Sequence, residues 1–476
     1  MKTTILSLLL LGFACVNAGV LLKTKHYGSM NHRDDLLPQA SNNEPLWFTQ
    51  KLDHFNPADD RQFKQKIYVN ETYYKRDGPV FVILGGEGPA APSGIEGRFI
   101  VNNYAQTFNG LIVSFEHRHY GESVPLGSLS KESLKYLSSQ QALADYAVLR
   151  DFIKSKYDVS LKSKWIAVGG SYSGNLAAWC VNFTHVNLTF STSAPVKASV
   201  AFPEYMSVVQ NSLGEECAGV VRKANDEIEN LLKTADGRAR LSKEFSVCNP
   251  IGHTDDDLST FLSGLADPIC GAVQYNLDNN SLGNKLGIKE VCSFMKPEEP
   301  LRSLINFTNH YNKVFERECS EGTYENYIKQ LQDETPYPKN QNAAGRSWMY
   351  QTCMEFGYYQ NAVGRDQPFS KYISLPWFLN QCEQLFGVKN VQANVDWTNQ
   401  YYGQLDIKAT NTIFANGNID PWHKLGLLKG GYVDANNVFF MNGTAHCADL
   451  YAPRDTDLES LKNTRARTLE LLEKWL

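Results

Sequence analysis

Beyond its N-terminal segment, the sequence lacks a long hydrophobic run, a block of basic residues and any metal-ligand motif. No later stretch of about 20 consecutive apolar residues occurs, so no membrane-spanning helix is expected. The 46 lysines and arginines are outnumbered by 51 aspartates and glutamates, and the net charge of −5 is spread along the chain. This distribution argues against nucleic acid or an anionic membrane as a partner. Because Cys-x-x-Cys and His-Glu-x-x-His are both absent, we expect no bound metal and no cofactor.

Residues 1–18 have the layout of a secretory signal peptide. Lys2 supplies the positive charge, residues 5–15 form the apolar region, and small residues end at Ala18, after which we predict cleavage. Residues 19–43 are polar and without pattern, and we interpret them as a flexible arm, with a propeptide as the alternative. The mature chain is therefore expected to enter the secretory pathway.

Sequons and cysteines fit passage through that pathway. Six Asn-X-Ser/Thr sequons make candidate glycosylation sites of Asn70, Asn182, Asn187, Asn279, Asn306 and Asn442. Ten cysteines are present, and loss of Cys15 with the signal peptide leaves an odd number, so at least one does not pair within the chain. Seven lie within residues 202–394, where we expect disulfides whose connectivity the spacing does not determine: Cys217, Cys248, Cys270, Cys292, Cys319, Cys353 and Cys382.

The most informative motif is Gly-Gly-Ser-Tyr-Ser-Gly at residues 169–174. An apolar run at residues 164–168 precedes it and helix-forming residues 175–180 follow, which is the context of a nucleophile elbow. In an elbow, small neighbours let the strand and helix backbones cross, and the helix N-terminus favours developing negative charge. Ser171 is therefore predicted to be a nucleophile. Ser173, where an elbow usually has glycine, is small enough to fit.

An aspartate and a histidine follow two later predicted strands. Residues 411–417 resemble a buried strand followed by Asp420, and residues 437–441 resemble another followed by His446. Ser, then Asp, then His, the last two each after a strand, is the order of the α/β-hydrolase triad. We predict Ser171 as nucleophile, His446 as general base and Asp420 as the residue that orients the imidazole.

Other nucleophile and base candidates are weaker. His117 and His119 precede the serine in the chain, and we interpret them as part of a structural loop after a strand at residues 111–115. Cys447 adjoins His446 but is not part of an elbow. It is therefore predicted to be structural or a free thiol.

The flanking pattern predicts an α/β-hydrolase core with an inserted cap domain. Apolar runs at residues 79–84, 111–115 and 188–194 are typical of strands buried on both faces, and residues 142–157 and 456–476 have helical spacing. Ser171 and Asp420 are separated by 249 positions. A bare α/β-hydrolase needs only two or three βα units of about 30 residues each there. We interpret the excess as a mostly helical, disulfide-bonded cap that covers the active site.

The predicted organisation has five parts. After the signal peptide (1–18) and the arm (19–43), residues 44–201 form the first part of the core, 202–394 the cap and 395–476 the second part of the core. A mature chain of roughly 458 residues is too long to fold around a single hydrophobic core, which favours two domains.

Several motifs in order resemble family S28 of the serine peptidases. They are Gly-Gly-Glu-Gly-Pro at 85–89, Glu-His-Arg-His-Tyr-Gly-Glu-Ser at 116–123, the elbow at 169–174, Asn-Gly-Asn-Ile-Asp-Pro-Trp at 416–422 and Ala-His at 445–446. The resemblance extends from about Trp47 to the C-terminus. It implies an α/β-hydrolase core with a helical cap, a Ser-Asp-His triad, peptide substrates, no cofactor, and secretion or delivery to lysosomes. Formation of a homodimer is left open.

Within the family, residues 348–359 are most similar to the thymus-specific branch. Met349 stands where the resemblance implies an aspartate in the dipeptidyl branch, which would anchor a substrate amino terminus. Asn175 stands where the carboxypeptidase branch has a methionine lining a proline pocket, so that pocket would be more polar here. We predict Asn175, Met349 and Trp422 as pocket residues, with burial in the core as the alternative for Trp422. Post-proline specificity is kept as an option.

The predicted reaction is hydrolysis through an acyl-enzyme. Backbone N–H groups of Tyr172 and of either Gly86 or Glu87 would bind the oxyanion. We interpret the Glu87 side chain as a solvated loop carboxylate, with contact to a substrate amine as the alternative. The predicted protein is a serine exopeptidase. A carboxylesterase or lipase, and a binding protein without activity on the same fold, are the alternatives.

Overall fold

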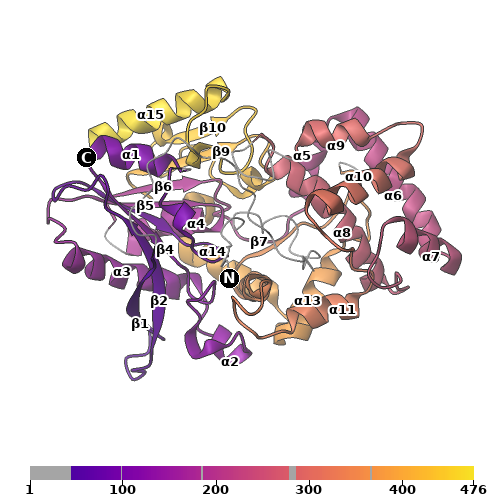
Figure 1. Ribbon diagram of the computed structural model, residues 1–476, viewed down its shortest axis with the longest axis horizontal. Coiled ribbons are helices and arrows are strands. Elements are labelled where there is room, and N and C mark those ends of the chain that lie inside the picture. The colour runs from indigo at the N-terminus through magenta and orange to yellow at the C-terminus, as the bar shows by residue number, and fades with distance from the viewer. Residues whose placement is uncertain (1–43, 98, 184–185, 278–285, 365–366) are drawn as a thin grey trace, which may run out of the picture.

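The computed structural model describes residues 44–476 apart from residues 98, 184–185, 278–285 and 365–366. The predicted signal peptide, the arm and the sequon at Asn279 lie outside the described residues, as does the side chain of Asn182. Figure 1 shows two lobes, one built on a β-sheet and the other built from helices.

An eight-stranded sheet forms the centre of the first lobe. Its order is β1-β2-β4-β3-β5-β6-β9-β10. β2 pairs antiparallel with β1 and with β4, while all pairings from β4 through to β10 are parallel. The strands are β1 (Leu46–Lys51), β2 (Gln62–Asn70), β3 (Val80–Leu84), β4 (Leu111–Phe115), β5 (Trp165–Gly170), β6 (Leu188–Thr192), β9 (Thr412–Gly417) and β10 (Val438–Met441). This is the α/β-hydrolase architecture, and the predicted fold class is confirmed.

Helices cover both faces of the sheet (Figure 1). Because side chains alternate along a strand, Val80 and Val82 pack with α3 (Ser139–Lys156) and α4 (Tyr172–Phe183). Phe81 packs on the opposite face with α1 (Ile100–Phe108) and α15 (Glu459–Trp475). Covered on both faces, the inner strands are apolar runs, as in β4, where every residue is buried.

The sequence predicted the inner strands to within a residue or two, but not the β1–β2 hairpin. In β1, the residues from Trp47 to Lys51 alternate between exposed and buried, and several of them are polar. That pattern belongs to an edge strand with one solvated face. The β1 strand therefore lacks the continuous apolar run by which the inner strands were predicted.

The second lobe consists mainly of helices between β6 and β9. They are α5 (Glu204–Leu213), α6 (Glu215–Leu232), α7 (Ala235–Glu244), α8 (Asp255–Gln274), α9 (Ile288–Phe294), α10 (Pro300–Val314), α11 (Tyr324–Leu331), α12 (Ala343–Gln351) and α13 (Leu375–Phe386). Within this region β7 (Ser199–Ala201), which precedes α5, pairs in parallel with β8 (Gly357–Tyr359), which follows α12. Residue 394, the predicted end of the cap, falls inside α14 (Val391–Tyr402), whose Tyr402 stacks on Trp179 of α4 at 3.7 Å.

Three disulfides cross-link the helical region. Six of the seven cysteines predicted to be cross-linked form them: Cys217–Cys292, Cys248–Cys319 and Cys353–Cys382. Cys270, in α8, is not in a disulfide, and neither are Cys180 and Cys447. Each bond restricts the unfolded chain and so stabilises the folded region.

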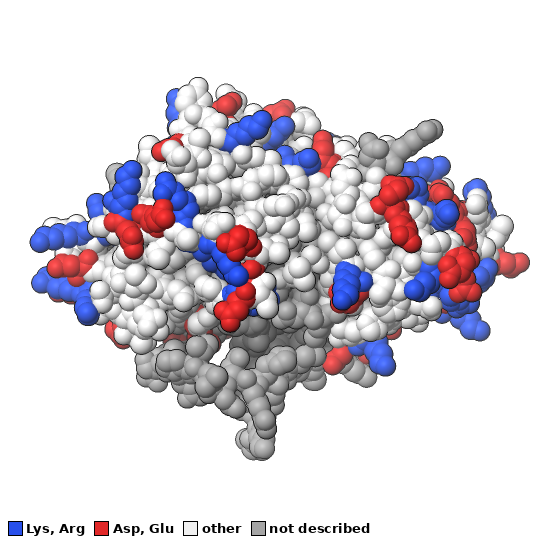
Figure 2. Space-filling model, turned by 90° about the horizontal axis from the view of Figure 1, so that it is seen from above, with Lys and Arg blue, Asp and Glu red and all other residues white. Residues whose placement is uncertain are grey.

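The charges on the face drawn in Figure 2 are interspersed. Lysine and arginine lie among aspartate and glutamate, with no broad patch of one sign on that face. Within the described ranges, no helix has both the length and the apolar character needed to cross a membrane.

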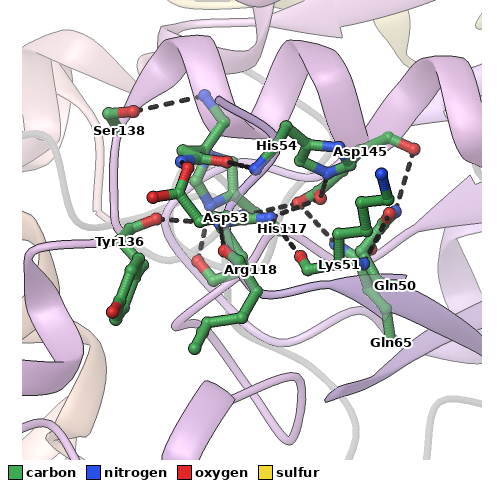
Figure 3. A network of polar contacts seen from close by, with 12 residues as sticks. Gln50, Lys51, Asp53, His54, Gln65, His117, Arg118, Tyr136, Ser138 and Asp145 are labelled. Atoms are coloured by element: carbon green, nitrogen blue, oxygen red, sulfur yellow. Dashed lines mark hydrogen bonds and ion pairs between the residues drawn. The ribbon is translucent and has the colours of Figure 1, made fainter. Parts of the chain in front are cut away.

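A buried network around Arg118 joins the β1–β2 region to α3 (Figure 3). Arg118 Nε donates to Asp145 Oδ2 at 2.7 Å and Nη2 to Oδ1 at 2.5 Å, and both side chains are fully buried. The remaining N–H groups donate to the carbonyls of Lys51, Leu52 and Tyr136, so every donor of the guanidinium is paired. Burial by itself would raise the pKa of Asp145, but the charge and hydrogen bonds of Arg118, together with the contact to His54, outweigh it and lower that pKa.

Candidate active site

Ser171 occupies the turn between β5 and α4. Its φ of 58° lies in the left-handed region, and its N–H donates to the Thr192 carbonyl of β6 at 3.0 Å. A Cβ on Gly169 would lie 2.0 Å from the carbonyl oxygen of Ser173, so only glycine fits there. A non-glycine residue held in this conformation at a strand-to-helix turn has the geometry of a nucleophile elbow.

Ser173 fits the position that glycine usually holds in an elbow. Its hydroxyl donates to the Gly170 carbonyl at 2.8 Å and accepts the Gly170 N–H at 3.1 Å. The hydroxyl is therefore paired inside the turn instead of disturbing it.

Asp420 and His446 form a buried pair on the loops after β9 and β10. Asp420 Oδ1 accepts the Trp422 N–H at 3.0 Å, and Oδ2 lies 2.9 Å from His446 Nδ1. The residues are 0% and 1% exposed. Burial opposes a charged imidazole, but the neighbouring Asp420 and Cys447 side chains together outweigh it and raise the pKa of His446 well above its ordinary value. The negative charge of Asp420 therefore favours the protonated form of the imidazole.

The His446 loop packs directly against the elbow. The Cys447 N–H donates to Ser193 Oγ, one residue beyond Thr192, at 2.9 Å. A Cβ on Gly170 would lie 2.7 Å from Cys447 Sγ. The loops that carry Ser171, Asp420 and His446 thus follow the carboxyl ends of the parallel strands β5, β9 and β10. Open α/β sheets bind their ligands at this end of the strands.

The loop after β3 lies beside the elbow. A Cβ on Gly86 would be 3.7 Å from Ser173 Cβ. Tyr172 begins α4, so its backbone N–H is one of the first in the helix and has no acceptor within it. The loop after β3 therefore lies next to the turn that carries Ser171, and the oxyanion role of Tyr172, Gly86 and Glu87 stays a prediction.

Glu87 lies in the same loop. The residue is partly exposed, yet burial raises the pKa of its carboxyl group, while the charge of His446 acts in the opposite direction. The interpretation as a solvated loop carboxylate, and the alternative of contact with a substrate amine, stay predictions.

Asn175 lies one helical turn after Ser171 and is fully buried. Its N–H donates to the Ser171 carbonyl at 3.2 Å, and its Nδ2 donates to the Pro195 carbonyl at 3.2 Å and to the Tyr358 hydroxyl at 3.1 Å. Its Oδ1 has no hydrogen-bond partner in the part of the chain described. The Tyr358 ring meets Trp422 edge-on with centroids 5.4 Å apart. Tyr358 therefore links two predicted pocket residues, Asn175 and Trp422.

Met349, the third predicted pocket residue, is buried in α12. It is 2% exposed and belongs to the main hydrophobic core. Its Sδ lies 3.7 Å from Thr352 Oγ1 within the same segment. Its role in binding substrate stays a prediction.

Gln274, at the end of α8, was missed by sequence analysis. Its backbone carbonyl accepts the His446 N–H at 2.8 Å, and its Oε1 accepts the Trp422 Nε1–H at 2.9 Å and the Tyr205 hydroxyl at 2.8 Å. The helical lobe therefore contributes directly to the position of His446. No local pattern marks Gln274, because Trp422 is 148 positions away in the sequence.

A buried chain of hydrogen bonds holds the Tyr172 side chain. Gln351 Nε2 donates to the Tyr172 hydroxyl at 2.9 Å and to Glu355 at 3.0 Å, and the Tyr172 hydroxyl is 2.9 Å from His117 Nε2. Tyr120 donates to Gln351 Oε1 at 2.6 Å. Burial lowers the pKa of His117 to about 4, so it is a neutral acceptor. His117 thus supports the elbow residue Tyr172, and Gln351 and Glu355 are further members that the sequence did not reveal.

Asp449 is a second buried carboxylate behind the elbow. Its Oδ2 accepts the Thr192 hydroxyl at 2.8 Å, and the Thr192 carbonyl also accepts the Ser171 N–H. Burial raises the pKa of Asp449 to about 6. A group that changes charge in mildly acidic solution therefore lies two hydrogen bonds from Ser171.

The predicted glycosylation sites differ in exposure. Asn187, Asn306 and Asn442 are exposed. Asn70 is buried, and its Nδ2 donates to the Ile95 carbonyl at 2.9 Å. A glycan would have to be attached to this buried nitrogen, so the burial of Asn70 disfavours glycosylation there, and its use stays a prediction.

The fold and the geometry around Ser171 place this chain among the serine hydrolases of the α/β-hydrolase class. In the described ranges, no three histidine, cysteine, aspartate or glutamate side chains are grouped so that they could hold a metal ion. Residues 50–468 match the serine carboxypeptidase S28 family, and the chain belongs to it. It is a serine-type peptidase.

Named relatives extend over most of the chain. The human thymus-specific serine protease is 33% identical over 453 residues, covering 90% of this chain and 86% of that protein. A Caenorhabditis elegans protein designated K12H4.7 is 36% identical over 96% of this chain and 92% of its own length. The mouse lysosomal Pro-X carboxypeptidase is 28% identical over 99% and 98%, respectively. The higher identity to the thymus-specific protein agrees with the branch that residues 348–359 indicated.

Proposed function

We propose that this peptidase cleaves peptides through a triad of Ser171, Asp420 and His446 as a secretory-pathway exopeptidase. One observation carries the assignment: the buried His446–Asp420 pair at 2.9 Å sits on loops that pack against the Ser171 turn. The chain order of the three residues and the family membership support it.

In the proposed reaction, His446 Nε2 removes the proton from Ser171 Oγ as Oγ attacks the scissile carbonyl. His446 then gives that proton to the leaving amine, and the C–N bond breaks to leave an acyl-enzyme. Water, deprotonated by the same imidazole, hydrolyses the ester and restores Ser171. Asp420 stabilises the imidazolium at both stages.

The oxyanion is proposed to be bound by two backbone N–H groups. Tyr172 donates one, and Gly86 or Glu87 donates the other. Each donor of this kind stabilises the transition state by roughly 3 kcal/mol. The buried hydrogen bonds of the Tyr172 hydroxyl with Gln351 of α12 and with His117 of the loop after β4 keep the first donor in place.

The wider setting is also proposed. We assign residues 1–18 as signal peptide, residues 202–394 as a cap over the site, and a secreted or lysosomal location for the product. Three disulfides in the helical region and a relative named as lysosomal support the secretory route. Assembly into a homodimer stays an open prediction.

The pocket next to Ser171 is proposed to disfavour proline because Asn175 contributes an amide oxygen that has no hydrogen-bond partner among the described residues. Asn175→Met should raise kcat/KM for proline over alanine at the cleaved position by about 10-fold, since extra buried apolar surface favours the ring. The measurement is the ratio of kcat/KM for two peptides that differ only at that residue. An unchanged ratio would show that position 175 does not contact the substrate side chain.

A peptide-library digest tests the proposed function. The mature protein and Ser171→Ala are incubated with the library at about pH 5 and about pH 7.5, and products are read by mass spectrometry. Serine-dependent removal of residues from one terminus is the expected result. Serine-dependent internal cleavage would refute exopeptidase action. Hydrolysis of p-nitrophenyl esters without peptide cleavage would favour an esterase.

A further inference from the structure

Gln274, the last residue of α8, contacts the loops of both His446 and Asp420. Its backbone carbonyl accepts the His446 N–H at 2.8 Å, and its side-chain Oε1 accepts the Trp422 Nε1–H at 2.9 Å. The backbone N–H of Trp422 donates in turn to Asp420 Oδ1 at 3.0 Å. One residue of the helical lobe (Figure 1) therefore holds the His446 loop through its backbone and the Asp420 loop through its side chain.

The side-chain amide of Gln274 has one orientation. The residue is 0% exposed, its Oε1 also accepts the Tyr205 hydroxyl at 2.8 Å, and its Nε2 donates to the Tyr275 hydroxyl at 2.8 Å. An indole N–H can only donate, so the amide atom that faces Trp422 has to be the oxygen. Reversing the amide would place the Nε2 donors against this N–H and leave it unpaired, which is costly in a buried site.

Tyr275, held by Gln274, contacts the imidazole directly. Its ring meets the His446 ring edge-on, with centroids 5.9 Å apart and an interplanar angle of 83°, and the residue is 1% exposed. The imidazole therefore contacts the Asp420 carboxylate through Nδ1 and packs against the Tyr275 ring. Since the Tyr275 hydroxyl accepts the Gln274 Nε2–H, the same amide influences the orientation of the imidazole plane.

The core strands hold these two loops together only up to a point. The Ile419 N–H donates to the Thr444 carbonyl at 3.1 Å, which ties the loop after β9 to the loop after β10. This bond lies one residue before Asp420 and two residues before His446. Gln274 supplies hydrogen bonds beyond that point, where the carboxylate and the imidazole are placed.

We propose that Gln274 is a positioning residue for peptide hydrolysis, which aligns the Asp420 carboxylate and the His446 imidazole from the helical lobe. The inference rests on the proposed triad and adds to it a residue that neither transfers a proton nor touches the substrate. The helical lobe is then part of the catalytic unit as well as a cover over it. Alignment matters because a displacement of about 1 Å can lower a catalysed rate by about 100-fold.

The test replaces the Gln274 amide while keeping its volume. Gln274→Met removes the acceptor and the donors, so kcat for a peptide substrate should fall by about 10- to 100-fold while KM changes by less than about 2-fold. The rate at which a fluorophosphonate labels Ser171 should fall by a similar factor, because this small probe needs the triad but no peptide-binding site. Gln274→Glu retains an acceptor oxygen, and a buried carboxyl group is neutral at about pH 5. It should restore kcat at that pH to within about 3-fold of the wild type.

Gln381→Met is the matched control. Gln381 lies in α13 of the same lobe and is also 0% exposed; its Oε1 accepts the Tyr327 hydroxyl at 3.2 Å and its Nε2 donates to the Trp377 carbonyl at 3.2 Å. Both substitutions leave buried polar groups unpaired, so both should lower the midpoint of thermal unfolding to a similar extent. Only Gln274→Met should change kcat and the labelling rate, since a purely structural role would affect the midpoints alone.

The remaining outcomes overturn the proposal or separate it from the proposed function. Unchanged kcat and labelling in Gln274→Met would show that the loops after β9 and β10 align the triad by themselves. Equal kinetic losses in Gln381→Met would indicate general loosening of the lobe, and a change confined to KM would indicate substrate binding; either result overturns the positioning role. If the wild type is labelled but cleaves no peptide, the peptidase function fails and the labelling rates still decide the role of Gln274. If the wild type is not labelled at Ser171, the triad and the positioning role fail together.

A second variant covers failure of Gln274→Met to fold. Gln274→Asn keeps the amide but shortens the side chain by one methylene group, so its oxygen no longer reaches the Trp422 indole in the same place. The labelling rate should fall by about 5-fold or more, since the alignment is weakened and not abolished. A labelling rate equal to that of the wild type would overturn the proposal.

Discussion

Asp420→Asn is expected to reduce kcat/KM for peptide hydrolysis by about 10⁴-fold. Asparagine keeps the size of the side chain but removes the charge that stabilises the imidazolium, and its amide favours the wrong tautomer of His446. The Asp420 carboxylate raises the pKa of His446. Removing it lowers that pKa, so the acidic limb of the residual activity should move to lower pH. The measurement is kcat/KM from pH 4 to 9 for both proteins.

Two further variants serve as controls for this experiment. Ser171→Ala measures the residual kcat/KM that does not depend on the proposed nucleophile. Asp406→Asn carries the same substitution at an exposed position and should leave the profile unchanged. A loss of less than about 10-fold in Asp420→Asn, or an acidic limb that does not move, would contradict the role assigned to Asp420.

Asp145→Asn is expected to destabilise the protein by about 3–5 kcal/mol. The substitution leaves the Arg118 guanidinium buried at 0% exposure without its counter-charge, which costs more than loss of a surface pair. The readout is the midpoint of thermal or urea unfolding. Because Arg118 holds the pKa of Asp145 below its ordinary value, this stabilisation is present above about pH 4. It is lost only as the pH falls through the lowered pKa.

The matched control for this experiment is Asp158→Asn. Asp158 pairs with Arg76 at 3.1 Å, but both side chains are largely exposed, at 82% and 72%. Loss of an exposed pair should change stability by about 1 kcal/mol or less. If the two variants unfold at similar midpoints, the buried pair does not hold the β1–β2 region in the way proposed.

The core strands and the candidate triad could be predicted because their signals are local. A strand covered on both faces must be a short apolar run, and β4 and β9 are such runs. An elbow needs small residues around Ser171 because backbones cross there, and Gly169 has no room for a Cβ. The β1–β2 hairpin lacked such a run and was missed.

Other parts of the site depend on residues that are distant in the sequence. Gln351 bonds to Tyr172 from 179 positions away, and neither residue carries a pattern that reveals the other. The sequon at Asn70 has the local sequence of a glycosylation site, but its side chain is buried against Ile95. Exposure depends on what packs over a residue, and the local sequence does not contain that information.

By itself, the sequence determined the α/β-hydrolase core, the elbow with Ser171, and the order in which Asp420 and His446 follow. Each of these depends on a few adjacent residues that must satisfy backbone geometry or strand burial. Only the tertiary structure decided that α8 holds the His446 loop through Gln274 and which cysteines pair. Those features arise where separate segments meet, and their energies depend on neighbours that the chain brings together only on folding.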